Sequence, residues 1–171
     1  MKYLKYILGI LAILVIGFFL LGLVKSEVTY ECEVIADKPL AESWAVSQDD
    51  KNMAKWLMGF QKTEHISGTP GTVGAVSDIY FISDGQEMTI RETITEIVPN
   101  ESISMLFTSD FMDMDYNLTM TSVDGKTKIK SNTTCRGNGI ISKSMVALMG
   151  SSMKTQEETN LSNLKKTIED N

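Results

Sequence analysis

Residues 137–170 read GNGIISKSMVALMGSSMKTQEETNLSNLKKTIED, and this stretch decides the fold class. After Gly137 and Gly139, apolar residues recur at spacings of three, four and seven, which is the period of an amphipathic helix. These apolar positions are Ile141, Met145, Leu148, Met149, Met153, Leu161, Leu164 and Ile168. The spacing predicts a C-terminal helix of up to about 30 residues with one apolar face to bury.

The chain before this helix alternates between apolar and polar residues, which is typical of half-buried strands. Two short helices are expected between the first two strands, one after Pro39 and one over residues 49–57, and Asp124-Gly125 predicts a tight hairpin. Because a meander of hairpins leaves one face open, the long helix is the element expected to cover it. The predicted class is α+β: a curved antiparallel seven-stranded sheet around one long C-terminal helix. The predicted strands cover residues 28–35, 60–66, 73–82, 88–98, 103–108, 112–122 and 127–135.

A different segment lies at the N-terminus, where residues 6–24 contain neither a charge nor a proline. Nineteen helical residues span roughly 28 Å, close to the ~30 Å of bilayer hydrocarbon. Lys2 and Lys5 precede this segment and Lys25 follows it, so the positive-inside bias predicts a cytoplasmic N-terminus. We therefore predict a cytoplasmic stretch over 1–5, a transmembrane helix over 6–24, and a domain over 25–171 on the periplasmic or extracellular side. The alternative is a cleaved signal peptide, whose apolar region is commonly about 7–15 residues.

Charge separates the same two parts of the chain. Lys2, Lys5 and Lys25 against Glu27 give residues 1–27 a charge of +2, so the whole-chain value of −6 leaves −8 for residues 28–171. An acidic domain without clustered Lys and Arg argues against nucleic-acid binding, which needs phosphate contacts. The chain also has no second long apolar stretch, which excludes a multi-pass membrane protein.

Four local strings stand out in the domain after the apolar segment. They are Ala36-Asp37-Lys38-Pro39 followed by Trp44, Met53-Ala54-Lys55-Trp56-Leu57, Gly68-Thr69-Pro70-Gly71-Thr72-Val73-Gly74, and Glu92-Thr93-Ile94-Thr95-Glu96-Ile97-Val98-Pro99. Their order and spacing resemble the START-like (SRPBCC) superfamily with the Bet v 1/START-like helix-grip fold, and specifically its polyketide cyclase/dehydrase and lipid-transport group. The resemblance covers nearly all of residues 28–171. It implies a cavity between sheet and helix for an apolar or amphipathic ligand, and it does not imply catalysis, because many members only bind.

The apolar faces of the predicted strands and helix are rich in methionine. Flexible, polarizable thioethers suit an adaptable hydrophobic surface. A core in which methionine fills gaps is the alternative, while the resemblance favours a cavity for a lipid or another hydrophobic small molecule, with no cofactor. The candidate ligand-binding residues are Met88, Ile90, Glu92, Met105, Phe107, Met114, Tyr116, Met145, Met149 and Met153.

Two carboxylates interrupt these apolar faces, Glu92 on a strand and Glu157 on the helix. A buried carboxylate must be paired, hydrogen-bonded or protonated, so either residue could orient a ligand or transfer a proton. The alternative is a wet edge, or pairing with Arg91 or a nearby lysine. A cyclase/dehydrase-type enzyme using Glu92, Arg91 or Tyr116 is therefore a second hypothesis, and a non-catalytic envelope interaction module is a third.

The two cysteines fall on the first and last predicted strands, which are antiparallel neighbours in the helix-grip topology. Our hypothesis is that Cys32 and Cys135 face one another and form a disulfide, which an oxidising compartment would preserve; the alternative is two buried free thiols. His65 is the only histidine, and it is expected at the surface near a strand end. The sequence therefore gives no support for a metal site.

Overall fold

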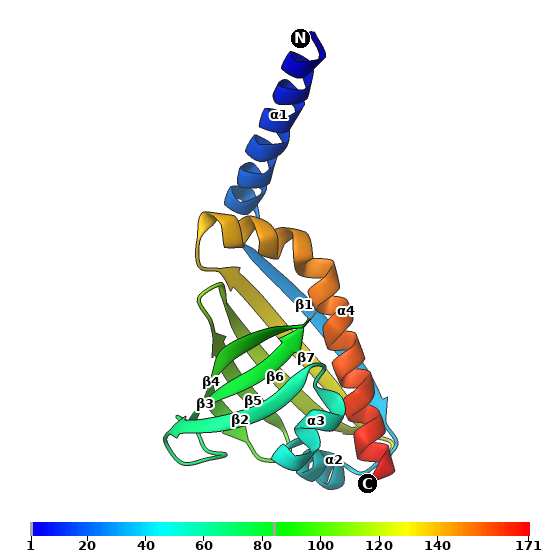
Figure 1. Ribbon diagram of the computed structural model, residues 1–171. Helices are drawn as coiled ribbons and strands as arrows, with labels where there is room; N and C mark the ends of the chain where they lie inside the picture. The colour runs from blue at the N-terminus through cyan, green and yellow to red at the C-terminus, as the bar shows by residue number, and fades with distance from the viewer. Residues whose placement is uncertain (1, 84) are drawn as a thin grey trace.

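The computed structural model describes residues 2–83 and 85–171 and has the predicted α+β architecture (Figure 1). A long N-terminal helix leads into a curved sheet that holds a second long helix against its inner face. The elements are α1 (Lys2–Val24), β1 (Glu27–Ala36), α2 (Leu40–Ser47), a short 3-10 turn η1 (Asp50–Asn52), α3 (Met53–Trp56), β2 (Phe60–Ser67), β3 (Val76–Ser83), β4 (Gln86–Val98), β5 (Ser102–Thr108), β6 (Met112–Val123), β7 (Lys126–Gly137) and α4 (Ile140–Asp170).

The seven strands form one antiparallel sheet in the order β1-β7-β6-β5-β4-β3-β2. Strands β2 to β7 follow one another as a meander, and β1 closes the sheet by pairing with β7. The predicted hairpin before β7 is present, because Asp124 and Gly125 both adopt positive φ angles, 52° and 79°. A two-residue turn requires this left-handed backbone, which glycine and aspartate tolerate. The seven-stranded helix-grip prediction is confirmed.

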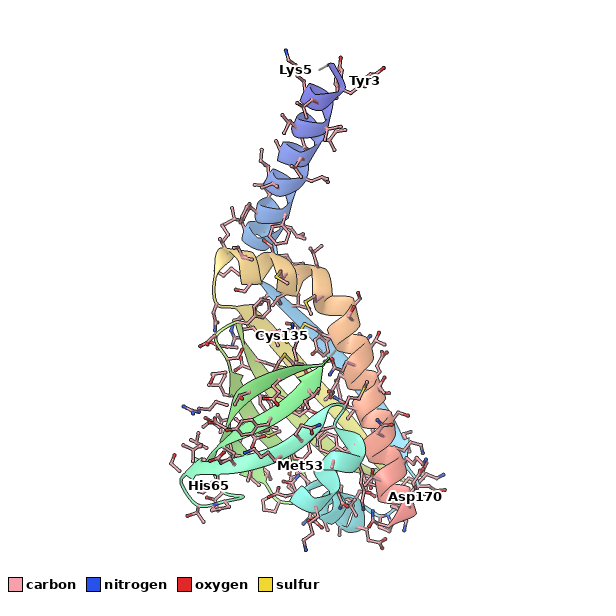
Figure 2. The ribbon with its side chains drawn as sticks, viewed as in Figure 1. Tyr3, Lys5, Met53, His65, Cys135 and Asp170 are labelled. Carbon is pink, nitrogen blue, oxygen red and sulfur yellow. The ribbon has the colours of Figure 1, made fainter. Side chains whose placement is uncertain are left out.

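Two groups of buried side chains join α4 to the sheet. The larger group includes Leu161, Leu164 and Ile168 of the C-terminal half of α4. The smaller group, Val28, Cys135 and Val146, lies at the end of the domain next to α1. Figure 2 shows Cys135 beneath the first turns of α4, whereas Met53 and Asp170 lie toward the opposite end.

Helix α4 is bent, and its first turns cross the domain below α1 before the helix continues along the sheet (Figure 1). The sequence of α4 includes the run Gly150-Ser151-Ser152, a composition at which helices commonly kink. Gly150 is buried, and a Cβ there would lie 2.7 Å from Val28 Cγ1. The absence of a side chain at Gly150 therefore lets α4 approach β1 closely.

The bend changes which residues of α4 face the sheet. In the first three turns, Ser142, Val146 and Gly150 are buried. The apolar stripe predicted for this part of the helix is exposed instead. Its members are Ile141, Met145, Leu148 and Met149.

Helix α1 is long and apolar enough to cross a membrane over Tyr3–Val24. Its last turns pack on the first turns of α4, where Gly22 is buried and a Cβ on it would lie 2.7 Å from the backbone nitrogen of Ser144. Only Lys25 and Ser26 separate α1 from β1. The connection between the apolar helix and the domain is therefore short.

Candidate ligand-binding site

The inner face of the sheet carries three rows of side chains that run from β4 or its neighbours to β1. Register places the members of a row side by side, and alternation places them on the face toward α4. The first row is Ser77, Glu92, Phe107, Met114, Cys135 and Val28; the second is Ile94, Met105, Tyr116, Thr133 and Tyr30; the third is Ile103, Leu118, Ser131 and Cys32. Several of these side chains, among them Met105, Phe107 and Met114, are only partly buried, whereas those of β7 are buried under α4.

A polar pair lies in the middle of this apolar surface. Tyr116 of β6 donates a hydrogen bond from its hydroxyl to Glu157 Oε1 of α4, at 3.0 Å. Burial raises the pKa of Glu157, although polar groups around the carboxylate oppose the rise. Burial also raises the pKa of Tyr116 well above its ordinary value, so the phenol is a neutral donor.

Two further hydroxyls lie in the adjoining positions of β7. The side chains of Ser131 and Thr133 are buried, and neither hydroxyl makes a hydrogen bond of good geometry within the described residues. Ser131 nevertheless lies close enough to Tyr116 and Glu157, and Thr133 to Tyr30, to influence the pKa values of those groups. An unpaired buried hydroxyl costs about 1–3 kcal/mol relative to a bonded one. The pair Tyr116–Glu157 and these two hydroxyls therefore form one buried polar cluster.

Glu92 provides a second carboxylate on the same face, in the row of Phe107 and Met114. Burial, with a smaller contribution from the negative charge of Asp50, raises its pKa to about 7. The alternative in which Arg91 pairs with Glu92 does not hold. Arg91 lies on the outer face, where its guanidinium donates two hydrogen bonds of 2.8 and 2.9 Å to Asp78. Arg91 is thus also removed from the acid–base candidates of the inner face.

The structure brings together about half of the predicted ligand-binding residues. Met105, Phe107, Met114 and Tyr116 occupy adjacent positions of the first two rows, and the rings of Phe107 and Tyr116 meet edge to face with centroids 6.1 Å apart. Met153 of α4 packs against the group that contains Val28 and Cys135.

Other predicted residues lie away from this centre. Ile90 and Met88 continue along the inner face of β4 toward the β3–β4 hairpin, where Met88 is 47% exposed. Met145 and Met149 do not join this wall, because both lie on the exposed side of the first turns of α4, and their contact with a ligand stays a prediction. The buried side of these turns consists of small residues, so the apolar period identified a stripe that faces away from the sheet.

Sequence reasoning missed the polar residues of β1 and β7 in the site, Tyr30, Ser131 and Thr133. The signal for Ser131 and Thr133 is the alternation of β7, which places them on one face with Ile129 and Cys135, and the signal for Tyr30 is its alternation with Val28 and Cys32 on β1. Burial strongly raises the pKa of Tyr30, whose hydroxyl lies 3.9 Å from Cys135 Sγ.

The disulfide hypothesis is contradicted by the strand register. Cys32 and Cys135 do lie on neighbouring strands and on the same face, but Cys32 is opposite Ser131 and Cys135 is opposite Val28. An offset of four residues corresponds to about 13 Å along a strand, beyond the ~7 Å limit for a bridge. Both cysteines are free and buried, as in the alternative.

A separate shallow hollow of about 260 Å³ lies on the outer face of the sheet, beside the irregularity at residues 94–96 of β4. Its side chains are mainly polar and include Ser104, Asn117 and Asn132, which alternate with the inner rows. His65 is exposed on the edge strand β2, with Nε2 3.1 Å from the carbonyl oxygen of Gly68. Over residues 2–83 and 85–171, no group of three His, Cys, Asp or Glu side chains is arranged to hold a metal ion.

Comparison with known proteins agrees with the geometry. Residues 27–169 match the family described as polyketide cyclase / dehydrase and lipid transport. The chain belongs to this family. A search of curated proteins found no match.

Solved structures give the same fold at low sequence identity. The aromatase/cyclase Zhui from Streptomyces sp. R1128 has a TM-score of 0.70 and 14% identity, over 84% of this chain and 94% of that one. Ara h 8.0201 has a TM-score of 0.66 and 17% identity, over 85% and 99% of the two chains. Protein CV1439 from Chromobacterium violaceum has a TM-score of 0.67 and 17% identity, over 82% and 96%.

Proposed function

We propose that this domain binds an amphipathic, lipid-like molecule between α4 and the inner face of the sheet. The observation that carries the proposal is the buried polar cluster that the Ser131 and Thr133 hydroxyls form with the Tyr116–Glu157 pair on an otherwise apolar face. Ligand sites are mostly apolar with a few convergent polar groups that fix orientation. The polar end of the ligand would bond to this cluster, and its apolar part would lie along Met105, Phe107 and Met114.

We also propose that α1 anchors the domain in a membrane, with the domain on the non-cytoplasmic side. Its length and composition suit a bilayer span, and Lys2 and Lys5 favour a cytoplasmic N-terminus. The close packing of Gly22 against Ser144 supports a retained helix over a cleaved signal peptide. An anchor would keep the inner site near a source of apolar ligand.

The test of ligand binding is mass spectrometry of lipids that co-purify with the full chain after extraction in detergent. The Thr133→Trp variant should lose the bound molecule, because the indole would occupy the space beside the polar cluster. Asn132→Trp is the matched control, since Asn132 is the next residue on β7 and points to the outer face. Equal ligand content in the two variants would contradict an inner site.

A gentler pair of variants tests the polar cluster without filling it. Tyr116→Phe removes the inner hydroxyl, and Tyr80→Phe removes a hydroxyl that donates to Glu64 at 3.1 Å on the exposed face. Only Tyr116→Phe should reduce the amount of bound ligand. The same reduction in both variants would contradict the proposal that the polar end of the ligand binds to Tyr116 and Glu157.

A cyclase/dehydrase-type reaction is the second candidate, and the two inner carboxylates favour it. Glu92, with a pKa of about 7, is suited to exchange a proton near neutral pH, and the Tyr116–Glu157 pair offers a neutral donor. Once the co-purified molecule is identified, Glu92→Gln separates the two functions. Loss of turnover with retained binding would support catalysis, whereas an unaltered ligand in both chains would support binding alone.

A further inference from the structure

The first turns of α4 carry an apolar face that no other described part of the chain covers. Ile141 and Leu148 are 57% and 60% exposed, and Met145 and Met149 are also exposed beside them. At 100° per residue these four positions occupy one side of the helix. Ser142, Val146 and Gly150 occupy the side that packs on the domain. This exposed set is hereafter called the α4 face.

The α4 face is next to the end of α1. The last turns of α1 contact the first turns of α4 at Gly22 and Ser144, and Figure 1 shows this part of α4 crossing below α1 at the junction with the domain. Helix α1 extends away from the domain from this junction. A bilayer that contains α1 therefore meets the domain at the first turns of α4.

Charge distinguishes this surface from the rest of the domain. Residues 28–171 carry a net charge of −8, yet residues 137–156 contain no Asp or Glu and include Lys143 and Lys154. Lys25 follows α1 at the same junction. Acidic groups are thus absent from the first turns of α4 themselves, although Glu27 at the start of β1 and Asp110 beside Phe111 lie at the same end of the domain. An apolar helix face with lysines and without carboxylates is the charge pattern that a phospholipid surface accepts.

The neighbouring loop adds a further apolar side chain at this end. Phe111, between β5 and β6, is exposed, and its carbonyl accepts a hydrogen bond of 3.0 Å from the backbone nitrogen of Asn138, just before α4. Asn138 Nδ2 also donates to the carbonyl of Ser109 at 2.8 Å. These bonds hold the loop to the start of α4, so Phe111 and the α4 face belong to the same end of the domain.

We infer that the first turns of α4 lie in the lipid headgroup region as an interfacial helix, with the α4 face buried in the bilayer surface. The inference rests on the proposed anchoring by α1 and commits to a phospholipid bilayer as the occupant of the α4 face. A helix of this kind places its apolar side about 5–10 Å into the boundary between headgroups and acyl chains. The Val28–Cys135 end of the sheet–helix interior is then held against the bilayer, while the opposite end points away from it.

The test uses the full chain in phosphatidylcholine nanodiscs, at one chain per disc, with lipid brominated near the carbonyl end of its acyl chains. A tryptophan is introduced by Leu148→Trp or, as a second position, Ile141→Trp. Ser162→Trp is the matched control, since Ser162 is exposed on α4 beyond the bend. The emission of the parent chain, which contains Trp44 and Trp56, is subtracted.

Quenching of both Leu148→Trp and Ile141→Trp, with a blue shift of their emission and little quenching of Ser162→Trp, supports the inference. A chain that does not stay with the disc refutes the anchor and the inference together. A chain that stays in the disc while Leu148→Trp and Ile141→Trp remain unquenched refutes the inference alone. If both tryptophans remain unquenched and the chains, although loaded at one per disc, are recovered at two per disc, a second copy covers the α4 face, and the inference is also overturned.

Discussion

Glu92 should make the free energy of unfolding depend on pH. Burial, together with the charge of Asp50, raises its pKa from the ordinary value of 4.5 to about 7. Because the folded protein holds this proton more tightly than the unfolded chain does, the stabilisation is fully present below about pH 4.5 and is lost as the pH rises through about 7. At about 1.36 kcal/mol per pKa unit, the interval corresponds to about 3 kcal/mol.

The Glu92→Gln variant removes this titration with little change of shape. It should match the parent in stability at pH 4 and exceed it by up to about 3 kcal/mol at pH 8. For a chain of this size that gain is about 6–12 °C in Tm, at about 2–4 °C per kcal/mol. Thermal unfolding of the full chain in detergent, followed by tryptophan fluorescence, measures it.

The matched control is Glu96→Gln, because Glu96 is exposed on the same strand. Its effect should stay within about 0.5 kcal/mol at both pH values. If the Tm of Glu92→Gln falls with pH as steeply as that of the parent, Glu92 does not carry the proton, and the physical account of this residue is refuted.

Two further predictions concern the packing of α4 and the cysteines. Gly150→Ala should destabilise the protein by about 1–3 kcal/mol, because the added Cβ would lie 2.7 Å from Val28 Cγ1. The control is Ser151→Ala at the exposed neighbouring position, which should change the free energy of unfolding by less than about 0.5 kcal/mol. The double variant Gly150→Ala/Val28→Ala should lose less stability than the sum of the single changes, and simple additivity would rule out the contact as the cause. For the cysteines, maleimide labelling without reductant should find two thiols after unfolding and slow reaction in the folded protein at pH 8, because burial raises the pKa of Cys135 to about 11. If the unfolded chain reacts with maleimide only after reduction, the two cysteines form a disulfide and the assignment of free thiols is wrong.

Most of the fold was predictable from local signals. Alternation and turn residues identified every strand, and Asp124-Gly125 located the last hairpin, because these features depend on neighbouring residues alone. The length of α4 followed from its apolar period for the same reason. The apolar spacing could not show which side of the first turns of α4 packs on the sheet. That side is set by the close approach at Gly150, and a glycine does not register in an apolar pattern.

The site was predictable in part for a related reason. Glu92 and Glu157 were identified because a carboxylate interrupts an apolar face, and both do lie on the inner side. Ser131 and Thr133 were missed as polar groups of the site because small hydroxyls are common on either face of a strand. The cysteine hypothesis failed because alternation gives the face of a residue but not its offset along the partner strand.

The two residues between α1 and β1, Lys25 and Ser26, have a mechanical consequence. Two extended residues reach at most about 7 Å. With α1 in a bilayer, the domain stays at one height above it and cannot swing its ligand across a gap to another membrane. The domain would therefore bind and release its ligand at one membrane only, and the ligand would enter or leave through the adjoining lipid or through a separate carrier protein.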